Sequence, residues 1–87
     1  DLAVVVDEDV PGWRVEEVIR SAGGSLLRGV LLFDLYRGEP IPPGKKSLAF
    51  SLTYQTDDRT LTDEEAASAQ ARIVRRLERE LSAQLRA

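Results

Sequence analysis

Asp34 and Tyr36 lie two residues apart, and their side chains suit a flat aromatic ligand such as an unstacked base. A tyrosine ring can stack on a base, a contact worth about 1–3 kcal/mol. The carboxylate of Asp34 can only accept hydrogen bonds, so it favours a base edge that carries donors, such as that of guanine. The hydroxyl of Ser47 could bond to the same edge. Nearby cations could hold phosphates: Arg37, Lys45 and Lys46.

The composition excludes several kinds of catalytic and metal sites. The sequence holds no cysteine and no histidine. This removes disulfides, zinc sites of the usual kind, Cys–His and Ser–His nucleophile pairs, and the commonest general base near neutral pH. We therefore expect no catalytic residue, no metal and no cofactor in this chain. The net charge of −3 argues against a protein that coats nucleic acid by charge alone, but it allows a module that reads a few bases.

The length leaves room for one domain, because 87 residues support a single core. The hydrophobic share of 43% and the charged share of 31% are typical of a soluble globular domain. No apolar run approaches the roughly 20 residues that would cross a bilayer. The chain begins at Asp1 and contains no methionine, so we interpret residues 1–87 as a single domain of a longer polypeptide.

The first half of the sequence predicts a strand, a helix and a second strand. Residues 2–6 form an apolar, β-branched run, and residues 7–9 end it with acidic side chains. Asp9 is a candidate helix cap, and Pro11 suits the first helical turn. Gly23 and Gly24 supply a left-handed stop, and residues 26–36 predict an extended strand. The helix has an apolar stripe made of Val15, Val18, Ile19 and Ala22.

The second half predicts a loop, a strand, a long helix and a short final strand. Residues 37–44 are rich in proline and glycine, which forbids regular structure, whereas residues 47–55 alternate as in a half-exposed antiparallel strand. Thr62 and Glu65 form a capping box at the start of the helix. The arginine-rich stretch 72–79, interleaved with glutamate, is typical of a solvated helix face. Residues 83–87 predict the final strand. The helix continues at Ala66, Ala69, Ile73, Leu77 and Leu81.

The order of these elements predicts an α+β fold, a ferredoxin-like βαββαβ two-layer sandwich. Both helices then cover one face of an antiparallel four-stranded sheet and leave the other face open. Alternation along each strand decides which side chains the open face carries, provided that no bulge interrupts a strand. In residues 26–36 the set that faces the helices is Leu31, Phe33 and Leu35. The open face then carries Ala3, Val5, Val30, Leu32, Asp34, Tyr36, Ser47, Ala49, Ser51 and Thr53.

Other functions fit the same architecture. A regulatory module of the ACT type would bind an amino acid at the interface of a symmetric homodimer and would have no affinity for RNA. A structural packing domain would cover the open face with protein, which the apolar residues Val5, Val30 and Leu32 would also suit. A hydrolase of the acylphosphatase type would need an asparagine to position water, and the sequence contains none.

Several blocks of the sequence carry a resemblance to one known family, in the family's order and spacing. They are Asp1-Leu2-Ala3, L-F-D-L-Y-R-G at 32–38, G-K-K-S-L-A-F at 44–50, R-T-L-T-D-E-E at 59–65, and Leu85-Arg86. The F-D-x-Y-x-G block followed by K-K-S-L-A-F is the most specific part. On these residues the chain resembles the C-terminal ferredoxin-fold anticodon-binding domain of the bacterial phenylalanyl-tRNA synthetase β subunit.

This resemblance implies that the open face receives the anticodon of tRNA(Phe), whose first base is a guanine. It implies that Tyr36 stacks on an anticodon base while Asp34 and Ser47 read the edge of that base, beside Ala3. Arg37, Lys45 and Lys46 are weaker candidates for contacts with the RNA backbone.

The resemblance also implies that the reaction belongs to the parent enzyme. That enzyme is a phenylalanine–tRNA ligase, which uses ATP and magnesium to attach phenylalanine to its tRNA at a site outside this domain. The expected protein partner is the synthetase α subunit, reached through the rest of the β chain in a heterotetramer of two α and two β subunits. The expected location is the cytoplasm, away from membranes.

Overall fold

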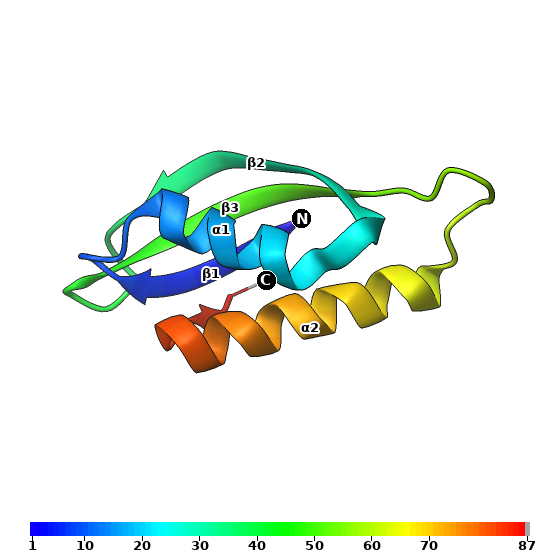
Figure 1. Ribbon diagram of the computed structural model, residues 1–87. Helices are drawn as coiled ribbons and strands as arrows, with labels where there is room; N and C mark the ends of the chain where they lie inside the picture. The colour runs from blue at the N-terminus through cyan, green and yellow to red at the C-terminus, as the bar shows by residue number, and fades with distance from the viewer. Residues whose placement is uncertain (87) are drawn as a thin grey trace.

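Two layers, a sheet and a pair of helices, make up the structure, a computed structural model that describes residues 1–86 (Figure 1). The strands pair in the order β2-β3-β1-β4, each antiparallel to its neighbour, and both helices lie on the same side of the sheet. The predicted ferredoxin-like fold is confirmed. The elements in chain order are β1 (Leu2–Asp7), α1 (Gly12–Gly23), the 3-10 turn η1 (Gly24–Leu26), β2 (Leu27–Tyr36), β3 (Lys45–Tyr54), α2 (Asp63–Leu81) and β4 (Gln84–Leu85).

The core lies between the helices and the inner face of β1 and β3. The apolar stripe predicted for the first helix is buried there, as are three of the apolar positions predicted for the second: Ala69, Ile73 and Leu77. Each buried Val, Leu, Ile or Phe side chain stabilises the fold by about 1.5–3 kcal/mol when it leaves water. From the sheet the core receives Leu2, Val4, Val6, Leu48 and Phe50.

The two helices begin differently. α2 has the predicted capping box: the hydroxyl of Thr62 accepts from the Glu65 N–H at 3.1 Å, and the Glu65 carboxylate accepts from the Thr62 N–H at 3.1 Å. The predicted cap of α1 is wrong, because that helix begins at Gly12 after Pro11 and has no side-chain cap bond. Asp9 instead lies in a turn between β1 and α1. The predicted glycine stop of α1 is present: the helix ends at Gly23, and Gly24 follows it with a positive φ of 68°.

A bulge in β2 makes part of the predicted inner and outer sets wrong. The pairing register shifts between Leu32 and Asp34, so that Leu32 pairs with Phe50 and Val30 pairs with Leu52. These two residues therefore face the helices and not the open side. Leu31 pairs with Ser51 on the open face and is 64% exposed, and Phe33 at the bulge is 53% exposed. Alternation in the sequence could not show this, because one extra residue in a strand moves the side chains before it to the opposite face of the sheet.

The remaining boundaries shift by a few residues. β3 begins at Lys45, two residues before the predicted start, because Asp7 of β1 extends the ladder to that position. β4 is the short final strand that the sequence predicted, reduced to Gln84–Leu85. Ala87, the last residue of that predicted strand, lies outside the described residues.

Candidate nucleic-acid interface

Two rows of paired residues cross the sheet on the face away from the helices. Ala49 of β3 pairs with Ala3 of β1 and with Asp34 of β2. In the next row, Ser47 pairs with Val5 and Tyr36. Residues that pair directly point to the same face of a sheet. The residues between these rows on β1 and β3 are buried against the helices, so the register places Ala3, Asp34, Tyr36 and Ser47 together on the open face.

The loop that follows β2 holds Tyr36 at its hydroxyl. That hydroxyl donates to the carbonyl oxygen of Glu39 at 2.6 Å, while 41% of the residue remains exposed. Gly38 lies between them with φ 107°, a backbone conformation that few residues other than glycine adopt. A Cβ at this position would lie 3.6 Å from the Tyr36 hydroxyl oxygen. The loop therefore fixes the ring position while leaving the ring accessible.

Arg86 lies across the same face. Its backbone N–H donates to the carbonyl oxygen of Ala3 at 2.8 Å, which continues the pairing of β4 with β1. Its guanidinium donates to the Ser47 hydroxyl at 3.1 Å and lies 5.5 Å from the centre of the Tyr36 ring, within cation–π range. Because Arg86 covers it, Ser47 is only 3% exposed although it faces the open side.

Sequence reasoning missed Arg86 as a member of this site. Its position near the chain end gave no reason to place it against residues 47 and 36, which lie far away in the sequence. The signal that could have found it was the Leu85-Arg86 pair, which is one of the blocks that carry the family resemblance.

Asp34 is the exposed carboxylate of the site. It takes part in none of the ion pairs among residues 1–86. Its neighbours across the sheet, Ala49 and then Ala3, have side chains of one carbon. A planar group could therefore approach the carboxylate over this row without meeting a large side chain.

The cations that border the site are largely compensated. Arg37 donates to both carboxylate oxygens of Glu8, with its Nε 2.9 Å from each; this bond and the guanidinium charge lower the pKa of Glu8, and Glu8 in turn raises the pKa of Arg37. Lys45 pairs with Asp7 at 2.7 Å. Lys46 alternates to the helix side of β3 and is only 7% exposed. The border of the site therefore carries little free positive charge.

One protein family, described as the ferredoxin-fold anticodon binding domain, matches residues 1–86. The chain belongs to this family. The match covers the open face, both helices and Arg86, so the resemblance that the sequence blocks predicted is confirmed.

Full-length relatives of this anticodon-binding domain show where it occurs. The phenylalanine–tRNA ligase β subunit of Moorella thermoacetica is 59% identical, that of Geobacillus kaustophilus 48%, and that of Clostridium acetobutylicum 42%. Each alignment spans 86 residues, which is 99% of this chain but 11% of the relative. The chain thus spans about a ninth of the length of the curated relatives it matches.

Among residues 1–86, no three His, Cys, Asp or Glu side chains lie close enough together to hold a metal ion. In the same part of the chain, neither helix is both long and apolar enough to cross a membrane.

Proposed function

We propose that this anticodon-binding domain belongs to the β subunit of a phenylalanine–tRNA ligase and binds the anticodon of tRNA(Phe) on its open sheet face. The observation that carries the proposal is the juxtaposition of Asp34, Tyr36, Ser47 and Arg86 on one face of a chain from an anticodon-binding family. The relatives named as phenylalanine–tRNA ligase β subunits support the choice of tRNA.

Each side chain has a role that its chemistry supports. The half-exposed ring of Tyr36, fixed at its hydroxyl, is the plate on which an anticodon base stacks. Asp34 accepts hydrogen bonds from the donors on the Watson–Crick edge of guanine, which are N1–H and the 2-amino group. Ala3 and Ala49 leave space for the base over their row. The site therefore favours a base with two adjacent donors over one with acceptors at the same positions.

Arg86 must shift when a base stacks on Tyr36. Its guanidinium lies over the ring in the free domain, so the base and the guanidinium compete for the same surface. A released guanidinium would also free the Ser47 hydroxyl for the base edge and could donate to a phosphate of the bound loop. This charge matters because Arg37 and Lys45 are paired with carboxylates.

The rest of the ligase would perform the reaction. In this proposal, ATP and magnesium act outside the domain, and the α subunit meets the domain through the rest of the β chain, in a cytoplasmic heterotetramer of two α and two β subunits. The domain contributes by holding the anticodon, which positions the tRNA for aminoacylation.

The first experiment measures binding of an anticodon stem-loop to the chain by fluorescence anisotropy. Tyr36→Ala removes the stacking surface, so we expect affinity to fall by about 1–3 kcal/mol, whereas Tyr36→Phe keeps the ring and stays within about twofold. Replacing the first anticodon guanine with inosine removes the 2-amino donor and should weaken binding to the unmodified chain. In Asp34→Ala the same replacement should have little effect, because the acceptor is gone.

Asp58→Ala is the control for charge, since it removes one exposed carboxylate from the loop before α2. It should leave the guanine preference intact. In the whole ligase, Asp34→Ala and Tyr36→Ala should lower aminoacylation efficiency through tRNA affinity and leave amino-acid activation unchanged. A loss of activation, or equal guanine preference in Asp34→Ala and the unmodified chain, would show that the site is assigned wrongly.

A further inference from the structure

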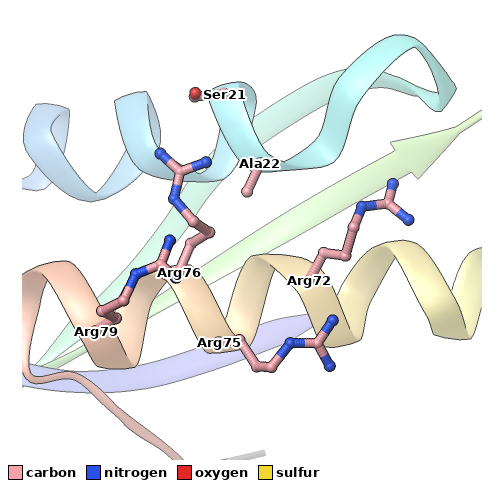
Figure 2. A pocket seen from close by; sticks show the side chains of 6 residues that line it. All are labelled: Ser21, Ala22, Arg72, Arg75, Arg76 and Arg79. Atoms are coloured by element: carbon pink, nitrogen blue, oxygen red, sulfur yellow. The ribbon is translucent and has the colours of Figure 1, made fainter.

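Arginines gather on one side of α2, in the layer opposite to the open face of the sheet. Arg72, Arg76 and Arg79 follow one another at steps of four and three residues, so they form a stripe along the helix, and Arg75 adjoins this stripe. Together with two residues of α1 they line a groove of about 260 Å³ between the helices (Figure 2). The groove is lined by Ser21, Ala22, Arg72, Arg75, Arg76 and Arg79.

The guanidinium groups do not all point the same way. Figure 2 shows Arg76 and Arg79 extending from α2 toward the part of α1 that holds Ser21, with Arg72 further along the helix. Arg75 projects to the other side. The groove is therefore bordered by guanidinium donors from α2 and by one hydroxyl from α1.

Carboxylates of the domain compensate little of this charge. Among residues 1–86, Arg76 forms an ion pair with Glu80, and Glu80 also lies 3.7 Å from Arg14, so one carboxylate serves two arginines. No ion pair within the same residues includes Arg72 or Arg79. Like charges three and four residues apart destabilise a helix. The stripe is thus a local excess of positive charge in a chain whose net charge is −3.

We propose that this groove binds a phosphate group, either one of free diphosphate or the terminal phosphate of an RNA. A terminal phosphate carries close to two negative charges at neutral pH and three acceptor oxygens, so it can accept from more than one guanidinium group at once. A carboxylate of a protein partner has one charge and two oxygens, which one guanidinium fork already satisfies. The groove is also smaller than pockets that enclose drug-sized molecules, of about 300–1,000 Å³. The proposal is independent of anticodon binding, because the groove and the open face belong to different layers.

The test is a titration of the chain with inorganic diphosphate, followed by the backbone amide signals in NMR spectra at constant ionic strength. We expect saturable movement confined to residues 72–79 and to Ser21 and Ala22. A second titration uses a short RNA with a 5′-phosphate and the same RNA with a 5′-hydroxyl, which distinguishes the two sources of phosphate. Saturable binding of diphosphate or of the 5′-phosphorylated RNA at the groove supports the proposal and shows which of the two carries the phosphate.

The variant Arg72→Gln/Arg79→Gln should weaken this binding by about tenfold or more, since it removes two charged donors. Its melting temperature without ligand should not fall, because the substitution relieves like-charge repulsion. Arg28→Gln is the control: it makes the same kind of substitution at an arginine that does not line the groove and that pairs with Asp57, and it should change binding by less than about twofold. The proposal is wrong if neither phosphate produces saturable movement at the groove, or if Arg28→Gln weakens binding as much as the double variant.

Discussion

Glu65 is a single carboxylate that fixes both the start of α2 and the loop before it. It accepts from both terminal nitrogens of Arg59, each at 2.5 Å, and from the backbone N–H and hydroxyl of Thr62, each at 3.1 Å. These bonds, led by that to Arg59, lower the pKa of Glu65 to about 2. The sequence predicted the bond to Thr62 because Glu65 follows it by three positions, which is the spacing of a capping box. It could not predict the bond to Arg59, because that depends on the path of the loop.

The lowered pKa of Glu65 predicts a specific dependence of stability on acid. A carboxyl whose pKa is depressed in the folded state stabilises the fold above its unfolded value of about 4.5, and this contribution is lost as the pH falls toward 2. In Glu65→Gln the contribution should be absent at every pH. Urea unfolding at a series of pH values should therefore show that the unmodified chain and Glu65→Gln differ most above pH 4.5 and converge near pH 2. Glu64→Gln, one residue away in the same first turn, should show no such convergence, and convergence in both variants would contradict the assignment.

At the scale of an element, the bulge in β2 divides the strand into a part that packs in the core and a part that faces the open side. Before the bulge, Val30 and Leu32 pack toward the helices; after it, Asp34 and Tyr36 face the open side, where the base-binding site is proposed. The sequence predicted the second half of the strand correctly because the alternation of Asp34, Leu35 and Tyr36 is not interrupted there. The faces predicted for the first half were wrong, because a run of leucine and valine can place either alternate set of side chains toward the core. Only the pairing with β3 shows where the bulge lies.

The bulge makes a testable distinction between two leucines. Leu31→Ala removes a side chain that is 64% exposed on the open face, so we expect the free energy of unfolding to change by less than about 0.5 kcal/mol. Leu48→Ala opens a cavity in the core and should cost about 2–5 kcal/mol. Chemical denaturation of both variants measures the difference. A large loss in Leu31→Ala would mean that β2 runs without the bulge.

At the scale of the whole molecule, charge is distributed so that the two layers differ. The open face has Asp34 exposed, its bordering Arg37 and Lys45 paired with carboxylates, and Arg86 held against the sheet. The helix layer carries the arginine stripe. The domain therefore offers few free cations to an RNA bound on the open face, and stacking and edge recognition must contribute most of the binding free energy there.

This distribution predicts weak dependence of anticodon binding on salt. When a protein neutralises Z phosphates of a single-stranded RNA, a plot of the logarithm of the binding constant against the logarithm of the salt concentration has a slope of about −0.7Z. For this domain we expect Z to be about 1–2. Glu8→Gln leaves the Arg37 charge uncompensated and should steepen the slope by about 0.7. Anisotropy titrations of the stem-loop at several salt concentrations measure both slopes. A slope steeper than about −3 in the unmodified chain would show that phosphate contacts dominate.

The sequence by itself determined the order of the elements, the capping box at Thr62 and the family, because these depend on local spacing and on residue blocks that lie close together in the chain. It also indicated that Asp34, Tyr36 and Ser47 would share a face, since two-residue alternation holds over short uninterrupted runs. The tertiary structure decided what lies over that face. Arg86 reaches Ser47 from 39 residues away, through the pairing of β4 with β1, and the bulge in β2 is set by its register with β3. Contacts between distant segments arise from packing of the folded chain, and no local pattern of residues encodes them.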